Sequence, residues 1–402
     1  MFEFFAKNMK LDNHKLYILL IYFLWLSSLI IYFFFGDLIK FGAVDNGVKL
    51  GSDSAYYLSE TQNIINGKSS IFENKTKFGY LTFLIPFLYF DVPLYNVVLL
   101  QILLTAISAF CLYRITEKYF SKFSGVICIG LFLLYFPIQL RNFYILTEIL
   151  FINTSIILSF FLVYFKKKNL IFIIFLLLFL ITIRTNGILF LFSILTSLFF
   201  YLKESKKYLY LIAYLIISLI IMFPLFNYLN FYLEHYDFIE NLNRGIIWGY
   251  SFDTKKICEA SCLSKELINN NYDNSILGYI QFVSFNFIEY FKIFFQKIFW
   301  MIFRVRPYYS DLHNTYITFF NIIIYCSFIY GFIKQPNKLF SLKVINYYIL
   351  LSIILAGLTF ADWSGRFSLY ILPFIFIFSS YGLFIFIKKI FGMINQKRNN
   401  TL

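Results

Sequence analysis

The stretch LYILLIYFLWLSSLIIYFFFG, residues 16–36, decides the class of fold, because it contains no charged residue and is as long as a membrane span. About 20 apolar residues are needed for a helix to cross the roughly 30 Å of bilayer hydrocarbon. A similar run, VINYYILLSIILAGLTF, occupies residues 344–360, and such runs recur along the whole chain. The composition agrees, with 60% hydrophobic and only 14% charged residues. We therefore expect an α-helical membrane protein and not a soluble domain.

The alternation of apolar runs with basic clusters predicts the topology. We expect an all-α polytopic integral membrane protein, a single domain over residues 1–402, with about ten transmembrane helices and both termini in the cytoplasm. The predicted spans lie near residues 16–36, 94–113, 123–138, 147–165, 170–184, 187–202, 208–229, 315–333, 344–360 and 368–387.

The net charge of +14 is distributed unevenly between the two sides of this topology. Six clusters between the runs contain 19 of the 35 basic residues and only four acidic residues, whereas the remaining segments hold 16 basic and 17 acidic residues. Loops that stay in the cytoplasm collect Lys and Arg for reasons of membrane insertion alone. The basic charge therefore indicates the cytoplasmic face, and we expect no nucleic-acid partner.

Most of the polar residues outside the membrane fall in two segments: a first loop at 37–93 and a long segment at 230–314. Each includes an ambiguous apolar stretch. The stretch at 78–90 is short and contains a proline, and the stretch at 285–305 carries three charged residues. We assign both to the outer membrane interface, since a charge at the bilayer centre costs roughly 2.5 to 3.5 kcal/mol. If either crosses, the sides of the later segments change.

The first loop contains the polar sequence GSDSAYYLSETQNIINGKS, residues 51–69. As a helix starting at residue 54, it would be amphipathic, with Asp53 at the N-cap and Gly67 just past the end. Helix capping alone would explain both residues. A carboxylate held at a helix terminus beside the membrane could instead take a proton from a hydroxyl group.

Three further charged residues lie near the outer ends of predicted spans. Glu148 begins an apolar run, where the helix dipole favours an acid. Arg184 marks a break between two runs and could reach the interface or a helix end. Arg366 precedes the last span, where a guanidinium could bind phosphate with paired donors or anchor the helix at the interface.

Together these positions resemble the polytopic GT-C glycosyltransferases, which use polyprenyl-phosphate sugars, and in particular the group of protein O-mannosyltransferases and lipid A aminoarabinose transferases. In that family the first outer loop carries an Asp followed by a Tyr-containing helix that ends at Gly, which Asp53, Tyr56, Tyr57 and Gly67 match. Family members often show Thr-Glu-Pro, Arg-Pro and Arg-Tyr at the other places. Here these read Thr147-Glu148-Ile149, Arg184-Thr185 and Arg366-Phe367. Protein O-mannosyltransferases also tend to show Asp-Glu where this chain has Asp53-Ser54.

The resemblance implies a hexosyl- or pentosyltransferase that moves a sugar from a polyprenyl-phosphate donor to a glycan, lipid or protein hydroxyl. Asp53 would be the general base, with Glu148 orienting the acceptor or the base. Arg366, and less directly Arg184, would hold the phosphate, and Tyr56 and Tyr57 would line the substrate site beside the prenyl chain. A periplasmic site at a bacterial inner membrane fits the charge pattern, and the endoplasmic reticulum obeys the same rule.

A divalent metal ion is an open question, because some relatives use one. Four possible ligands lie in the outer segments, although no paired-ligand spacing appears: His235, His313, Glu60 and Glu234. Cys258 and Cys262 lie in the same long outer segment, where they could form a disulfide or remain reduced.

Two other functions remain open. A secondary transporter would place ionisable residues or broken helices near the middle of the membrane. An O-antigen polymerase or ligase would have a long outer loop and arginine contacts to its lipid, without needing a base after the first span.

Overall fold

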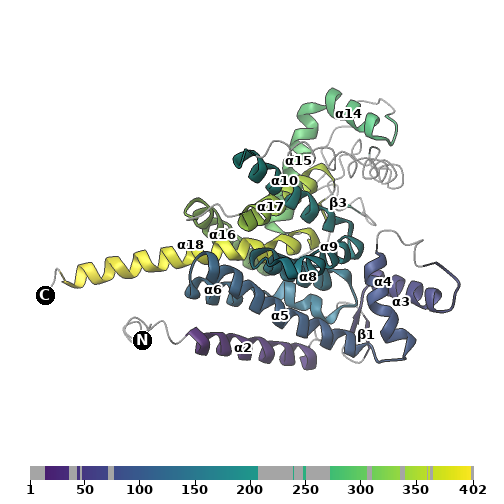
Figure 1. Ribbon diagram of the computed structural model, residues 1–402, viewed down its shortest axis with the longest axis horizontal. Coiled ribbons are helices and arrows are strands. Elements are labelled where there is room, and N and C mark those ends of the chain that lie inside the picture. The colour runs from purple at the N-terminus through teal and green to yellow at the C-terminus, as the bar shows by residue number, and fades with distance from the viewer. Residues whose placement is uncertain are drawn as a thin grey trace. The chain divides into compact units, whose positions relative to one another are not determined.

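The protein is almost entirely helical in a computed structural model (Figure 1). The structure describes residues 14–35, 43–45, 48–70, 77–206, 239, 248–249, 272–305, 310–335, 340–359, 361–362 and 365–399. The helices before the second half of the chain are α2 (His14–Phe35), α3 (Ser52–Ile65), α4 (Phe78–Tyr89), α5 (Tyr95–Tyr119), α6 (Lys122–Leu133), α7 (Phe136–Gln139), α8 (Thr147–Val163), α9 (Leu170–Ile183) and α10 (Ile188–Glu204). The later helices are α14 (Ile276–Phe285), α15 (Phe287–Phe303), α16 (Asp311–Ile333), α17 (Phe340–Leu358) and α18 (Arg366–Asn399).

Short elements connect these helices in the described ranges. Three are 3-10 turns: η3 (Leu140–Phe143), η4 (Lys167–Asn169) and η5 (Thr185–Gly187). Four are brief strands, paired as β1 (Ala43–Asp45) with β2 (Val48–Leu50) and β3 (Trp248–Gly249) with β4 (Ala361–Asp362). The first pair is antiparallel and the second is parallel.

Five helical segments in the described part of the chain are long and apolar enough to cross a membrane. A sixth is added if the pair α6 and α7–η3, which is bent by 59° at a short break, forms one span. This confirms the expectation of an all-α membrane protein. The five segments are Tyr95–Tyr119, Thr185–Glu204, Asp311–Ile333, Phe340–Leu358 and Arg366–Ile390.

Nine of the ten predicted runs coincide with helices, and the tenth, 208–229, lies outside the described residues. Several of these helices are short, since α8 has 17 residues, α9 has 14 and α6 has 12. At 1.5 Å per residue, α9 is about 21 Å long and does not by itself match the hydrocarbon thickness.

The chain divides into two compact units, which are described separately. The first comprises Met1–Leu191, Ile323–Ile345 and Leu369–Leu402, and the second comprises Phe192–Ile322 and Asn346–Ser368. In the first unit α5 packs against α6 and α8, and α2 lies along α6 (Figure 1). Parts of α16 and α18 approach closely there, because a Cβ at Gly382 would lie 2.0 Å from the Ser327 carbonyl oxygen.

A buried hydrogen-bond network fixes the turn between α7 and α8 in the first unit. Trp25 Nε1 donates to Gln139 Oε1 at 2.7 Å, and Thr105 Oγ1 donates to Asn142 Oδ1 at 2.8 Å. Gln101 Nε2 donates to the Asn142 carbonyl oxygen at 2.8 Å. All five side chains are buried, where polar groups must be satisfied within the protein. The network therefore holds in place the turn that leads into α8.

The first-loop helix begins earlier than its sequence predicts. Helix α3 starts at Ser52 with Gly51 as its N-cap, so Asp53 lies in the first turn and is not the cap. The reason is Ser54, whose Oγ accepts a hydrogen bond from the Gly51 backbone N–H at 3.0 Å. The other end is as predicted, since Gly67 follows the helix with a left-handed φ of 68°.

Helix α15 in the second unit buries a charged residue. Lys297 is fully buried, and its Nζ donates to the carbonyl oxygen of Thr359, the residue after α17. The amine thus satisfies a carbonyl oxygen at the end of α17. Large apolar side chains on the opposite side of α15 are exposed, including Phe291 and Phe295. Lys297 was one of the charges that placed residues 285–305 at the interface, and the exposed apolar side fits a lipid environment.

Candidate functional site

The centre of the candidate site is an ion pair between Glu148 and Arg184 in the first unit. Glu148 is the second residue of α8 and is fully buried, and Arg184 follows the last residue of α9. Arg184 Nη1 lies 3.4 Å from Glu148 Oε1 and donates to Thr147 Oγ1 at 2.6 Å. The helix dipole and the guanidinium both favour the ionised carboxylate.

The R-T-N-G break between α9 and α10 orients Arg184 toward Glu148. Its backbone is extended, with φ −153° and ψ 142°, between α9 and the turn η5. Gly187 closes the turn onto the end of α9, because a Cβ there would lie 2.4 Å from the Leu180 carbonyl oxygen. A larger residue would push the turn away from α9, so the position of Arg184 depends on the glycine at residue 187.

Tyr370 of α18 covers the guanidinium. Arg184 Cζ lies 5.2 Å from the centre of the Tyr370 ring, within the range of a cation–π contact. The Tyr370 ring in turn packs edge-on against Phe151 of α8, with the ring centres 4.9 Å apart. The arginine is therefore held by a carboxylate, a hydroxyl and an aromatic face.

Tyr80 of α4 connects this pair to the first outer loop. The neighbouring Gly79 lets α4 approach the end of α9 closely, since a Cβ at Gly79 would lie 2.5 Å from Thr182 Oγ1. The Tyr80 side chain is fully buried, and burial raises its pKa well above the ordinary value, with smaller contributions from Glu148 and Tyr57. Its ring lies edge-on to Tyr57, with centres 5.0 Å apart.

Helix α3 presents two faces. Tyr57 is buried, so the face that was expected to lie beside a prenyl chain packs on α4 instead. Tyr56 is 44% exposed, and Asp53 is partly exposed in the first turn. Lys77, at the start of α4, places its Nζ 5.2 Å from the Tyr56 ring centre and 4.9 Å from that of Tyr57. The lysine and the tyrosines thus join α3 to α4.

The strand before α3 also contacts the segment before α8. Lys49 of β2 forms a parallel bridge with Tyr144, and the Ile145 backbone N–H donates to the Lys49 carbonyl oxygen at 3.4 Å. Lys49 Nζ and Arg141 Cζ lie 6.0 Å and 5.8 Å from the centre of the Tyr144 ring. The segments that lead to Asp53 and Glu148 are therefore neighbours.

Arg366 belongs to the second unit. It is the first residue of α18 and follows Gly365, which has a left-handed φ of 68°. The helix dipole at this end attracts an anion.

The possible metal ligands do not gather in the described part of the chain. No group of three or more His, Cys, Asp and Glu side chains that could hold a metal ion occurs among the described residues. His235, Glu234, Cys258 and Cys262 lie outside those residues.

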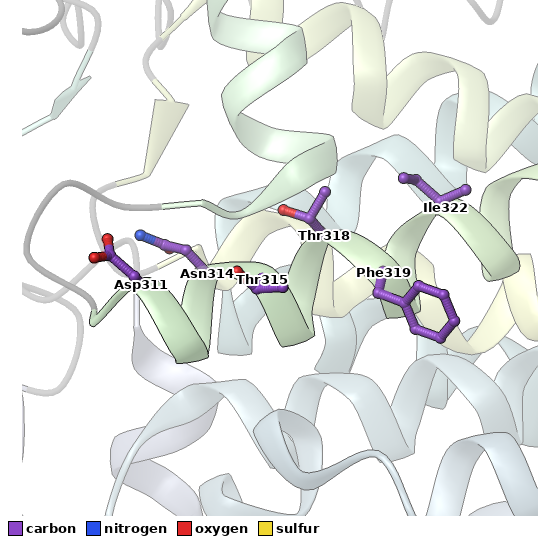
Figure 2. A pocket seen from close by; sticks show the side chains of 6 residues that line it. All are labelled: Asp311, Asn314, Thr315, Thr318, Phe319 and Ile322. Carbon is purple, nitrogen blue, oxygen red and sulfur yellow. The ribbon is translucent and has the colours of Figure 1, made fainter.

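A hollow of about 410 Å³ lies along the part of α16 that belongs to the second unit, and Figure 2 shows the side chains that line it. Polar side chains line it near the start of α16 and apolar ones further along the helix: Asp311, Asn314, Thr315, Thr318, Phe319 and Ile322. All six come from one helix, and none is a predicted site residue. The hollow therefore gives no support to the predicted site.

The structure brings Tyr57, Glu148 and Arg184 into one connected group, with Asp53 and Tyr56 on the helix that carries Tyr57. It adds residues that the sequence analysis missed, above all Tyr80 and Tyr370. The only sequence signal for Tyr80 is the glycine before it in a short apolar run. No protein-family model, curated protein or solved structure matches the chain.

Proposed function

We propose that the protein is a GT-C-type glycosyltransferase, which moves a sugar from a polyprenyl-phosphate donor to an acceptor hydroxyl at the outer membrane face. The observation that carries the proposal is the grouping in the first unit. The first-loop helix with its carboxylate, the acid that opens α8 and the arginine at the R-T-N-G break are distant in sequence, yet they are linked through Tyr80 and the Lys49 strand.

The chemistry needs few groups. The acceptor oxygen attacks the anomeric carbon, the bond from that carbon to the phosphate oxygen breaks, and the polyprenyl phosphate leaves with the bonding electrons. Asp53 takes the proton of the acceptor hydroxyl, and a single displacement inverts the anomeric centre. Because the leaving group is good, catalysis consists mainly of positioning and stabilisation of charge.

Asp53 is assigned as the base because it is partly exposed, whereas Glu148 is fully buried and committed to Arg184. Glu148 then orients the site and does not take the proton. Arg184 is similarly committed to Glu148 and Thr147, and the family resemblance assigns the donor phosphate to Arg366. The exposed ring of Tyr56 provides a face on which a sugar could stack.

The proposal includes the finer topology: ten spans, both termini cytoplasmic, and a site in the periplasm at a bacterial inner membrane. The acceptor is a glycan, a lipid or a protein, and a divalent ion would be a further component. The uneven distribution of basic residues supports this orientation.

A transporter is the second candidate, because one observation favours it. The pair α6 and α7–η3 is bent by 59° at a short break, and broken helices line the binding sites of many transporters. The buried Glu148–Arg184 pair would also suit a transport pathway.

Glycan analysis of a deletion strain separates the two candidates. The strain is complemented with wild type or with Asp53→Asn at equal membrane abundance, and surface and lipid-linked glycans are compared by mass spectrometry. The glycosyltransferase predicts that wild type restores a defined sugar and that Asp53→Asn does not. Equal restoration by both would reject Asp53 as the base.

Asp91→Asn is the matched control. Asp91 is an exposed aspartate of the same outer loop, and its φ of 50° is a left-handed conformation that Asn adopts readily. This variant is expected to restore the sugar fully. If it failed as Asp53→Asn fails, the loss would reflect the charge of the loop and not a particular carboxylate.

A further inference from the structure

Helix α3 packs against α4 in the first unit, and its buried residue Tyr57 lies on the same side of the helix as the proposed base. Asp53 and Tyr57 are four residues apart within α3, so their side chains lie on the same side of the helix, one turn from each other. The orientation of the Asp53 side chain therefore depends on the contacts that hold Tyr57.

Two contacts from α4 hold Tyr57. The Tyr80 ring meets it edge-on at 5.0 Å, and Lys77 Nζ lies 4.9 Å from its ring centre. Lys77 also lies over Tyr56, so both tyrosines of α3 are fixed to the first turn of α4. Aromatic pairs of this kind restrict orientation as well as contributing buried area.

Tyr80 is itself held from the other side. Gly79 brings the start of α4 against Thr182 and Ile183, directly before Arg184. Arg184 is fixed by Glu148, Thr147 and the ring of Tyr370. The Tyr80 hydroxyl is buried without a hydrogen-bond partner among the residues that the structure describes, so the position of this side chain is determined by its ring and its neighbours.

We propose that Tyr80 is a positioning residue, through which the Glu148–Arg184 pair sets the orientation of α3 and therefore of Asp53. The contact runs from the ion pair through the end of α9 to Gly79 and Tyr80, and from the Tyr80 ring through Tyr57 to the first turn of α3. The effect on turnover rests on the proposed function, whereas the effect on α3 does not.

The two parts of the Tyr80 side chain make different predictions. Tyr80→Phe keeps the ring and removes only a hydroxyl that has no partner among the described residues, so α3 is expected to stay in place. Tyr80→Leu removes the ring contact with Tyr57. A displacement of about 1 Å at a reacting group can lower a rate about 100-fold.

Hydrogen–deuterium exchange of the full-length protein in lipid nanodiscs tests the effect on α3. Tyr80→Leu is expected to speed amide exchange in residues 52–65 at least 10-fold, and Tyr80→Phe is expected to match wild type. Tyr119→Leu is the matched control, because Tyr119 is a buried tyrosine whose hydroxyl bonds Ser341 and which ends α5. It is expected to lower thermal stability without changing exchange in α3.

The same variants in the glycan assay, at equal membrane abundance, give the catalytic readout. We expect Tyr80→Phe to restore the product and Tyr80→Leu to restore far less of it, because a small displacement of a reacting group can lower a rate about 100-fold. Unchanged exchange in α3 for Tyr80→Leu would overturn the positioning role. If exchange rises as expected but wild type itself restores no sugar, the proposed function fails while the structural role of Tyr80 stands.

Discussion

Replacing Arg184 with methionine should destabilise the protein more than replacing its partner Glu148 with glutamine. The difference arises from burial, since the Glu148 side chain is 1% exposed and that of Arg184 is 19% exposed. Arg184→Met leaves a buried carboxylate without its cation. Glu148→Gln leaves a partly exposed guanidinium that still lies over Tyr370.

The geometry sets the size of the effect. At 3.4 Å and an effective dielectric constant of about 20, the attraction between the two charges is about 5 kcal/mol before desolvation is subtracted. Removing one partner of a buried pair typically costs about 3–5 kcal/mol, which we expect for Arg184→Met. Loss of a hydrogen bond to a charged group costs about 1.5–3 kcal/mol, which we expect for Glu148→Gln.

The double variant provides the test. With both charges absent, no buried ion lacks its counter-ion, so the two losses should not add, and we expect a coupling energy of about 2 kcal/mol. The free energy of unfolding is measured in mixed micelles by denaturing-detergent titration, followed by circular dichroism. Additive losses, or a smaller loss for Arg184→Met than for Glu148→Gln, would refute the buried ion pair as a stabilising contact.

Two further predictions concern packing and pH. Gly382→Ala would put a Cβ 2.0 Å from the Ser327 carbonyl oxygen and would push α16 away from α18. This variant should lower the melting temperature, at a cost of about 1–3 kcal/mol. Gly130→Ala is the control and should leave the melting temperature unchanged, because its Cβ would meet only Ile21 at 3.7 Å. Burial lowers the pKa of Lys297 from 10.5 to about 7. Between these two pH values the unfolded state binds one proton more than the folded state, so the free energy of unfolding increases as pH rises. Unfolding titrations from pH 7 to 10 should show this rise in wild type and a flatter curve in Lys297→Met; parallel curves would mean that Lys297 keeps its charge in the fold.

The positions of the helices could be predicted because long apolar runs leave a chain few alternatives in a membrane. The break near Arg184 was also visible, since a charged residue and a glycine interrupt two apolar stretches. Its partner was not, because Glu148 lies 36 residues earlier and the pairing depends on how α8 and α9 pack. The start of α3 was misjudged because Gly51 is the N-cap and its backbone N–H donates to Ser54 Oγ, so Asp53 falls in the first turn.

The packing of Tyr80 and the burial of Lys297 could not be predicted from the pattern of charged residues. The run that contains Tyr80 was assigned to the interface because it is short, yet Gly79 allows it to pack against α9. Lys297 was taken as a reason to place its segment at the membrane interface, and its burial was not foreseen because the carbonyl oxygen of Thr359, 62 residues later, accepts its hydrogen bond. In both cases the deciding contact is with a residue that is distant in sequence.

The most direct test of sugar transfer uses the purified protein. Wild type and Asp53→Asn in nanodiscs are incubated with a lipid extract of the host that contains its polyprenyl-phosphate sugars and acceptors, and the lipids are followed by mass spectrometry. The account predicts that wild type consumes one polyprenyl-phosphate sugar and releases an equal amount of polyprenyl phosphate, while Asp53→Asn does neither. If wild type leaves every polyprenyl-phosphate sugar unchanged, the protein is not a transferase of this class.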